Sequence, residues 1–470
     1  MTTTSIDIPT PAAEATISWA ARLRSEPAVL AALALSLALY YLGPGPTFVV
    51  GAVAFFALTF YRPDLQLAMV PLAAPLFYRP RAIGPYFFSL AEFVIVCGVA
   101  AWALRDGLTL VRTRSMPALR ELARNRGVWL AGALVLIGAL WLLVPDAAHR
   151  KVAAYDFWRT VLSPVLFFLL ILRWLRLERD LWRMTGAWLV AAALVGREAV
   201  EQYLFGQTTL MEGVGRVVSV YPSATALGIY LGRALALGIV LVFLLPSGWR
   251  TWKIAAAALS IVIGLGTLFS FARGAWLGVL VALAVVALIA RSRPLLGTLG
   301  AVLLLGLASL PFVRVERITS LFDFSKSENT GVARTQIWAA ALRILRDHPF
   351  TGIGQDQFLY ADPKYGVPQA RLLITAHPHD WILDFSLRLG LPGIAWAITA
   401  LAYLFWQSIA LWRRYKDTAL GALTLALLAS MIDFAVHGLV DMAYFTMDLA
   451  LTFWLTLGLL LVLKRLDTPD

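Results

Sequence analysis

Long apolar runs, repeated along nearly the whole chain, constrain the fold more than any other feature. A transmembrane helix needs roughly 20 apolar residues to cross a bilayer. About fourteen runs approach that length, near residues 27–43, 46–60, 63–78, 87–104, 127–145, 158–175, 182–203, 222–246, 252–270, 274–290, 294–312, 391–411, 418–436 and 444–463. Only helices and closed barrels span membranes, because backbone polar groups inside hydrocarbon must bond to one another. The runs are too long and unbroken for barrel strands, which alternate over about ten residues.

Composition supports the same conclusion. Of the 470 residues, 60% are hydrophobic and 14% are charged, whereas soluble domains have about 45–50% apolar and about 25% charged residues. The formal net charge of +12 does not indicate nucleic-acid binding, because lysine and arginine collect in the cytoplasmic loops of membrane proteins. We therefore predict an all-α, polytopic transmembrane helical bundle with about 12–14 spans and a large helical loop on the outer side.

Basic residues cluster in alternate turns between the apolar runs, for example at 105–126, 173–183 and 413–416. Because such clusters favour the cytoplasmic side, they predict that both ends of the chain are cytoplasmic. The predicted divisions are a cytoplasmic tail (1–26), a transmembrane bundle (27–312), a long outward-facing loop (313–380), C-terminal transmembrane helices (381–463) and a second cytoplasmic tail (464–470).

The outward-facing loop contains a helical pattern. In "VARTQIWAAALRILRDHPFTGIG", the apolar residues Ile337, Ala341, Leu342 and Leu345 recur at helical spacing. We predict an amphipathic helix on the membrane surface. It should begin near Thr330 or Gly331, end at the Asp-His-Pro sequence 347–349, and lead into a turn at the glycines that follow.

The outer side also receives arginines that topology does not require. The polar side chains predicted there are Arg216, Arg273, Arg334, His377, His379 and Asp380. Arg273 lies between two apolar runs with almost no loop, where a charge is costly without a partner. Arginine binds phosphate bidentately, so three arginines could hold a diphosphate and stabilise it as a leaving group. Histidine has an unperturbed pKa near neutrality and suits a base toward a hydroxyl.

Each signal also has a structural alternative. An arginine at a helix end is more often an interfacial anchor, and a histidine before a helix is more often structural. Asp433 and Asp441 flank a short outward turn, and for them a hydrogen-bonded structural role is at least as good an interpretation as a role in the site. The sequence has no H-E-x-x-H, no Asp-x-Asp and no cysteine cluster, so we expect no metal and no cofactor.

Three motifs resemble the O-antigen ligase and O-antigen polymerase superfamily. "FSFARGAWLG" resembles its helix start, which contains Ser-Arg-Gly, and "GVARTQIWAAALRILRDHPFTGIGQDQF" resembles its Arg-x-x-x-Trp helix and Pro-x-x-Gly-x-Gly turn. "HDWILDFSLRLGLPG" resembles its motif of His-Asn, nine residues and Gly-x-x-Gly. The spacing from His379 to Gly390 and Gly393 matches. Asp380 replaces the asparagine, which leaves the role of that residue open. The resemblance is specific over roughly 255–400.

The resemblance implies a metal-independent, inverting glycosyltransferase of the bacterial inner membrane with its active site on the periplasmic side. It would move a glycan from undecaprenyl diphosphate to a hydroxyl of a glycan or lipid A–core acceptor, in contact with membrane lipids and without nucleic acid. By the resemblance, Arg273 and Arg334 bind the donor diphosphate and His379 is the catalytic base. Arg216 joins them on charge and predicted side alone.

Several choices stay open at this stage. His377, Asp380 and Asp384 are assigned supporting roles, and Asp384 with Arg388 fits an i, i+4 pair that braces their helix. Ligase and polymerase are not separated, although the match is clearest for a ligase. The alternative function is a polysaccharide or lipid-linked glycan transporter or flippase without catalytic activity, which would show internal repeats and a central cavity. No repeat is visible in the sequence.

Overall fold

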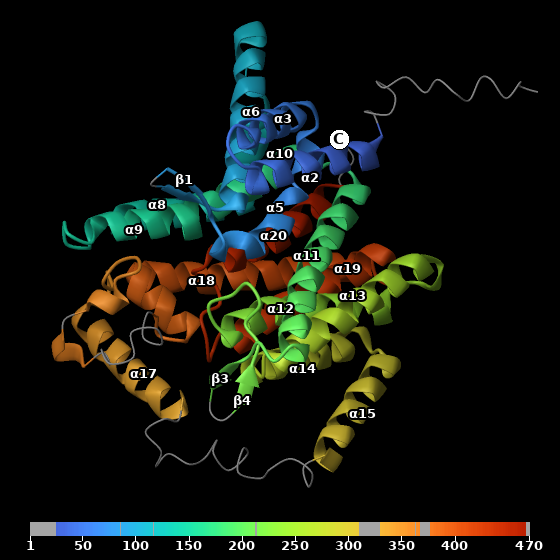
Figure 1. Cartoon of the computed structure of the whole chain (residues 1–470), viewed down its shortest axis with the longest axis vertical. Helices are drawn as coiled ribbons and strands as arrows, with labels where there is room; N and C mark the ends of the chain where they lie inside the picture. The colour runs from blue at the N-terminus through green and yellow to red at the C-terminus, as the bar shows by residue number, and fades with distance from the viewer. Residues whose placement is uncertain are drawn as a thin grey trace, which may run out of the picture.

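The computed structural model describes residues 25–84, 86–115, 117–211, 214–309, 330–361, 363–366 and 377–466. Most of the two predicted tails and the segments 310–329 and 367–376 of the outward-facing loop lie outside the described residues. Within the described part the chain is helical except for two small antiparallel hairpins, β1(Arg81–Ile83) with β2(Tyr86–Phe88) and β3(Thr209–Met211) with β4(Val214–Arg216). The predicted all-α polytopic fold is confirmed (Figure 1).

Helices account for the rest of the fold. In chain order they are α2(Glu26–Leu42), α3(Thr47–Tyr61), α4(Pro63–Gln66), α5(Met69–Ala73), α6(Leu90–Thr113), α7(Pro117–Ala123), α8(Arg126–Leu140), α9(Arg150–Phe157), α10(Ser163–Trp174), α11(Glu178–Leu204), α12(Ala224–Leu244), α13(Arg250–Phe269), α14(Arg273–Ala290), α15(Arg293–Ser309), α17(Thr330–Asp347), α18(Trp381–Arg414), α19(Ala419–His437) and α20(Met447–Arg465). Short turns of 3-10 or π helix link several of them: η2(Ala74–Tyr78), η3(Trp141–Leu143), η4(Trp158–Leu162), η5(Ser247–Trp249), η7(Phe358–Tyr360) and η8(Pro363–Tyr365).

Nine helices among the described residues are long and apolar enough to cross a membrane, or ten if one bent pair forms a single span. That pair, Thr47–Tyr61 and Pro63–Tyr78, is bent by 119°, at a proline that begins a new helix. The sequence pattern predicted about 12–14 spans. The difference arises because an apolar run does not reveal a bend, and because α2 and α15 have only 17 residues each. In addition, α11 carries charged residues near both ends.

The C-terminal helices form the centre of the bundle. Of the membrane-spanning part of α20, 94% is buried inside the protein, against 78% for α19 and 72% for α12. Helices α12, α14 and α19 pack on one another, and Gly278 of α14 lies so close to Asp433 of α19 that a Cβ there would overlap its carboxylate. Glycine allows this close approach between membrane helices. The packing places the start of α14 next to the end of α19.

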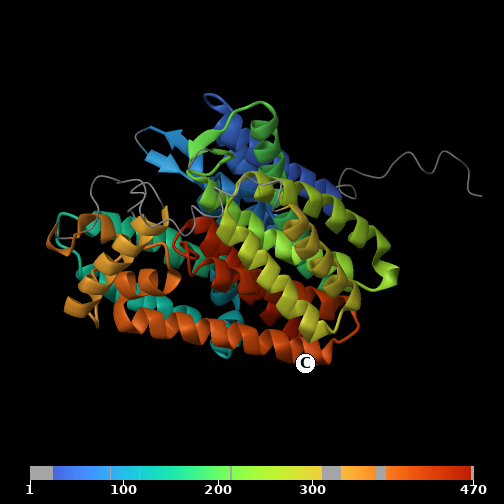
Figure 2. The same cartoon turned by 90° about the horizontal axis from the view of Figure 1, so that it is seen from below.

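Helix α18 is interrupted near its start. Gly390 has φ 63° and ψ −159°, a non-helical conformation inside the helix, and glycine adopts it without the Cβ penalty of other residues. The first arm therefore leaves the axis of the long second arm, which runs along the lower edge in Figure 2, opposite the two hairpins. The Gly-x-x-Gly spacing noted in the sequence thus marks a change of direction.

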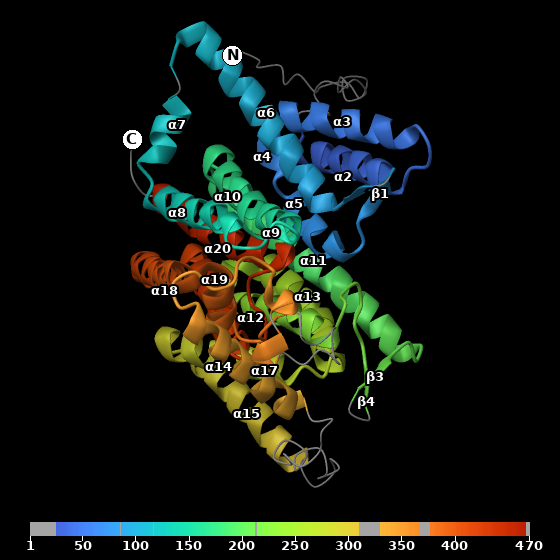
Figure 3. The ribbon, with the colours of Figure 1, turned by 90° about the vertical axis from the view of Figure 1, so that its left-hand side faces the viewer.

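Helix α17 confirms the predicted helix in the outward-facing loop, but its surroundings differ from the prediction. It begins at Thr330 and ends at Asp347, and Gly352 and Gly354 form the turn with positive φ. The sequence pattern places its apolar face on the membrane surface. Instead, this face forms a small separate core with later loop residues and α18, made up of Ile337, Ala340, Ala341, Ile344, Phe358, Tyr365 and Leu387. Figure 3 shows α17 next to α18.

Candidate functional site

The turn His377–Asp380 leads directly into α18. Asp380 is the N-cap of this helix and accepts a hydrogen bond from the Leu383 backbone N–H at 2.9 Å, which satisfies one of the free donors at a helix start. The Trp381 N–H donates to the Gly438 carbonyl at 2.8 Å, so the turn is tied to the end of α19. His379 has a φ of 52°, an uncommon conformation for a residue with a side chain and one that clusters at functional sites.

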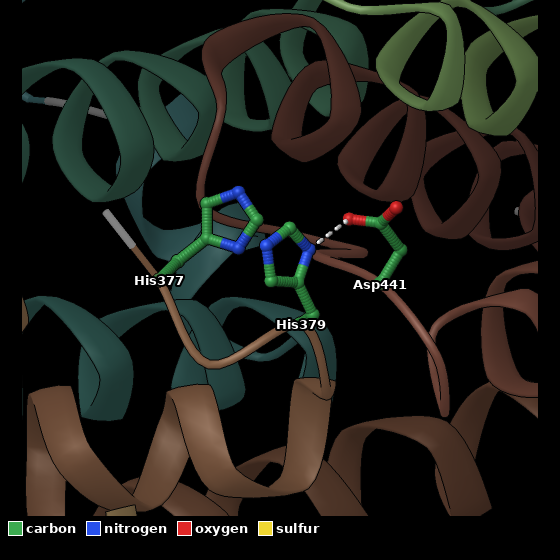
Figure 4. Close-up of side chains that lie close together, drawn as sticks. All are labelled: His377, His379 and Asp441. Atoms are coloured by element: carbon green, nitrogen blue, oxygen red, sulfur yellow. Dashed lines mark hydrogen bonds and ion pairs between the residues drawn. The ribbon is translucent and has the colours of Figure 1, made fainter. Parts of the chain in front are cut away.

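His379 pairs with an aspartate from a different part of the chain. Its Nδ1 lies 3.2 Å from Oδ1 of Asp441, which belongs to the turn between α19 and α20. The ring of His377 lies on the other side of His379, with ring centroids 4.2 Å apart and edge-on packing. Figure 4 shows the three side chains in a row. Two segments separated by 62 residues thus meet in one cluster.

Asp441 is buried and ionised. Burial by itself would raise the pKa of its carboxyl. The hydrogen bond from His379, the electrostatic attraction of that ring and the smaller contributions of His377 and Arg334 outweigh burial and lower the pKa below the ordinary aspartate range. An ionised carboxylate can only accept hydrogen bonds, so His379 Nδ1 carries the hydrogen. Oδ1 of Asp441 also accepts from the Met442 N–H at 2.7 Å, which fixes the orientation of the carboxylate.

Arg334 brings a positive charge to the same carboxylate. It lies in the first turns of α17, and its Nη2 is 3.7 Å from Oδ2 of Asp441. One helical turn later, Trp338 donates from Nε1 to the carbonyl of Pro378 at 2.9 Å. The Arg-x-x-x-Trp spacing therefore serves two contacts with one helix face: the arginine reaches Asp441 and the tryptophan holds the histidine turn.

The Pro-x-x-Gly-x-Gly turn after α17 fits against the break in α18. A Cβ on Gly390 would overlap the Phe350 carbonyl, and a Cβ on Gly352 would overlap the Leu387 carbonyl. The Ile353 N–H donates to that Leu387 carbonyl at 2.7 Å, one of the acceptors that the helix break releases. The glycines of both motifs are therefore needed for the same contact.

Arg273 begins α14 and is exposed. The next residue, Gly274, packs on the turn that holds Asp441: a Cβ there would lie 2.7 Å from His437 Nε2 and 3.1 Å from Val440 Cγ2. Arg216 reaches the same region from β4, since its Nε donates to the Ser270 carbonyl at 2.8 Å. Both arginines thus come from segments joined to the cluster.

Comparison with known families agrees with the motifs. A family model described as O-antigen ligase matches residues 258–398. Residues 258–398 are therefore similar to the O-antigen ligase family, in agreement with the predicted resemblance. The match and the apolar helices support an O-antigen ligase-like, multi-pass membrane glycosyltransferase that acts in general on a lipid-linked glycan and an acceptor. No curated protein matches the chain. The matched residues coincide closely with the region of roughly 255–400 that carries the predicted resemblance.

The structure brings some of the predicted site residues together and places others apart. His377, His379 and Arg334 gather around one carboxylate, and Arg273 and Arg216 lie in the adjoining segments. Asp384 points elsewhere. It accepts from Arg388 Nε at 2.7 Å, and Arg388 Nη1 donates to Asp156 at 2.7 Å. The predicted i, i+4 pair is present, and it braces α18 against α9.

Asp441 is the residue that sequence analysis left undecided between a structural and a functional role. It lies beyond the ligase match, and 62 residues separate it from its partner His379. The available signal is its spacing from Asp433 and His437, at four-residue intervals along α19 and the turn that follows. That spacing puts Asp433 and His437 on one face of α19 and Asp441 in the turn beyond it, but it does not identify which residue across the fold they approach.

Proposed function

We propose that this protein transfers a glycan from undecaprenyl diphosphate to an acceptor hydroxyl on the periplasmic face, by a metal-independent displacement that inverts the anomeric centre. His379 is the base, Asp441 positions it, and the arginines bind the diphosphate. The supporting observation is the His379–Asp441 hydrogen bond of 3.2 Å, with Arg334 3.7 Å from the same carboxylate. The ligase match supplies the reaction class.

The pair suits proton abstraction. Since Asp441 is ionised and accepts the Nδ1–H of His379, Nε2 is the nitrogen with the lone pair. This nitrogen takes the proton from the acceptor hydroxyl as the oxygen attacks the anomeric carbon. The ring then carries two N–H groups and a positive charge, which the Asp441 carboxylate stabilises without taking the proton itself. His379 returns to its starting form by releasing the proton to water.

The other half of the reaction is the departure of the diphosphate. As the new C–O bond forms, the bond from the anomeric carbon to the diphosphate oxygen breaks and its electron pair leaves with the phosphate. Arg334, Arg273 and Arg216 provide guanidinium groups that remain charged at every physiological pH and can bind this growing charge in bidentate fashion. A single displacement of this kind inverts the configuration, because the hydroxyl attacks from the face opposite the leaving group.

The side of the membrane and the divisions of the chain follow from the charge pattern. Basic clusters at 105–126, 173–183 and 413–416 favour the cytoplasm. We accordingly propose a periplasmic catalytic loop at 313–380, cytoplasmic ends and residence in the bacterial inner membrane. The acceptor is a lipid A–core hydroxyl in a ligase or a second lipid-linked glycan in a polymerase, and we favour the ligase because the family motifs match it best.

Asp441→Asn should lower the rate constant for transfer by about a hundredfold to ten-thousandfold and leave the KM for the donor nearly unchanged. A neutral amide cannot stabilise a charged imidazole or select the tautomer with hydrogen on Nδ1. The measurement is glycan transfer from lipid-linked donor by purified protein in detergent, across a range of pH. Asp417→Asn is the matched control, because Asp417 lies exposed at the other end of α19. Wild-type turnover by Asp441→Asn would contradict the positioning role.

Arg273→Lys should weaken transfer by about tenfold to a hundredfold, the value of one or two hydrogen bonds to a charged group. Lysine keeps the charge but lacks the planar fork that binds two phosphate oxygens. The same assay measures it, with Arg291→Lys, at the opposite end of α14, as control. If Arg273→Lys and Arg291→Lys transfer glycan at the same rate, a positive charge at position 273 is sufficient. Bidentate binding of the diphosphate by Arg273 would then be ruled out.

A further inference from the structure

The cluster on the outer side contains side chains that commonly bind transition metals. His377, His379 and Asp441 each offer one ligand atom, and these atoms all lie within 4.8 Å of one another. Two imidazoles and one carboxylate form a ligand set that suits Zn²⁺ and leaves a fourth position open. Metal-site motifs in the sequence did not indicate this set, because one ligand comes from a turn 62 residues further along the chain.

Two of the ligand atoms lack hydrogen-bond partners among the described residues. The Nδ1 of His377 is buried without one, and so is Oδ2 of Asp441, which lies 3.7 Å from Arg334 Nη2. A buried polar atom without a partner is costly. Figure 4 shows one ring nitrogen of His377 facing the His379 ring and the other turned away from it. His377 Nδ1 and Asp441 Oδ2 are therefore two buried atoms in one cluster that can each donate an electron pair to a metal ion.

The spacing is close to that of a bound ion. Zinc–nitrogen and zinc–oxygen bonds of about 2.1 Å in a tetrahedron place the ligand atoms about 3.4 Å apart. His379 Nδ1 and Asp441 Oδ1 are already 3.2 Å apart. Since the widest separation in the set is at most 4.8 Å, side-chain rotations that shorten it by up to about 1.4 Å complete the set. The backbone of both turns is fixed by the hydrogen bonds described above, so the side chains need only small movements.

We propose that His377, His379 and Asp441 bind one divalent transition-metal ion of the Zn²⁺ type, and that this ion inhibits the transferase. The claim that the ion binds is based on the geometry of the cluster. The claim that the ion inhibits transfer rests on the proposed function. A metal on His379 takes the electron pair of a ring nitrogen, and a metal on Nδ1 leaves the hydrogen on Nε2. Either way the ring no longer accepts the proton of the acceptor hydroxyl.

Arg334 sets the strength of the site. Its guanidinium opposes a second positive ion close to Asp441, so the wild-type protein should bind Zn²⁺ more weakly than a variant without this charge. Arg334→Gln is therefore expected to bind Zn²⁺ several-fold more tightly, whereas it should impair binding of the diphosphate donor. An adventitious surface site would not respond to this substitution.

The test is a titration of the purified full chain, stripped with chelator in detergent, with Zn²⁺ in competition with a chromophoric chelator. Wild type should bind one ion per chain at this site. His377→Gln should lose at least about tenfold in affinity, and Arg334→Gln should gain. His149→Gln is the matched control, since His149 stacks on Tyr360 with ring centroids 4.4 Å apart and is not part of the cluster. Wild-type Zn²⁺ affinity in His377→Gln would overturn the site.

A second arm separates the inhibitory part from the proposed function. Zn²⁺ should inhibit transfer by wild type, chelator should restore it, and chelator alone should not reduce it. Bound Zn²⁺ with undiminished transfer would overturn inhibition. Suppose that the metal-free protein does not transfer glycan, while the titration shows that wild type binds Zn²⁺ and His377→Gln binds it poorly. That result would overturn the proposed function and support the metal site. Thermal unfolding of each variant checks that the change is confined to the cluster.

Discussion

His379→Gln should lower glycan transfer by about a thousandfold or more, while the protein still inserts and folds. General base catalysis contributes about a hundredfold to ten-thousandfold, and glutamine has no basic nitrogen with which to replace it. The glutamine side chain is also long enough to keep a hydrogen bond to Asp441, so the buried carboxylate does not lose its neighbour outright. Loss of activity would then report on chemistry and not on unfolding.

The measurement is single-turnover transfer from the lipid-linked donor, together with donor binding and thermal unfolding. Donor affinity should change little, because the arginines that bind the diphosphate remain. His348→Gln is a useful control, since His348 follows α17 in the same loop and contacts Tyr365 instead of the cluster, with 3.3 Å between its Nε2 and the Tyr365 hydroxyl. Full activity in His379→Gln would rule out His379 as the base.

Gly390→Ala should destabilise the protein by about 3 kcal/mol or more. The conformation with φ 63° and ψ −159° is unfavourable for any residue with a Cβ, at a cost of about 1–3 kcal/mol, and the added methyl would also overlap the Phe350 carbonyl. Because Phe350 belongs to the loop turn, relief of the overlap requires that turn to move away from α18. Activity should fall with stability, since the histidine turn is held by the same loop.

Thermal unfolding in detergent, followed by loss of the monodisperse protein, measures this effect. Gly107→Ala provides the matched control, because Gly107 lies in α6 and a Cβ there would meet nothing within 4 Å. Alanine in a helix interior should stabilise this position by about 0.5–1 kcal/mol. If Gly390→Ala unfolds at the same temperature as Gly107→Ala, the break in α18 does not depend on glycine.

The helical bundle could be predicted from the sequence because the apolar runs are about as long as a helix that crosses a bilayer. The helix at Thr330–Asp347 and its terminating turn could also be predicted, from periodicity and from the local chemistry of proline and glycine. The packing of this helix against the rest of the protein could not be predicted. An amphipathic pattern shows that one face is apolar, but it does not show whether lipid or protein covers that face, and here Leu387 of α18 belongs to the covering.

The site was predictable as separate motifs and not as an assembled cluster. Local spacing identified His379 and Arg334, because each lies in a short recognisable pattern. Asp441 has no such pattern around it, and its closeness to His379 depends on how α19 ends beside the start of α18, through the bond from Trp381 to Gly438. Contacts of this kind depend on packing across the whole bundle, which one sequence does not encode in any local window.

The interlocked glycines of the loop turn and α18 have a consequence for protein engineering. Trp338 bonds to the histidine turn and Ile353 bonds to α18. A side chain at Gly352 or Gly390 would overlap the backbone of the facing segment. The loop and the first arm of α18 therefore form one mechanical unit. A chimera designed for a new acceptor preference should exchange residues 330–393 as a single segment. A loop grafted alone would have to pack against a break in α18 that comes from a different protein.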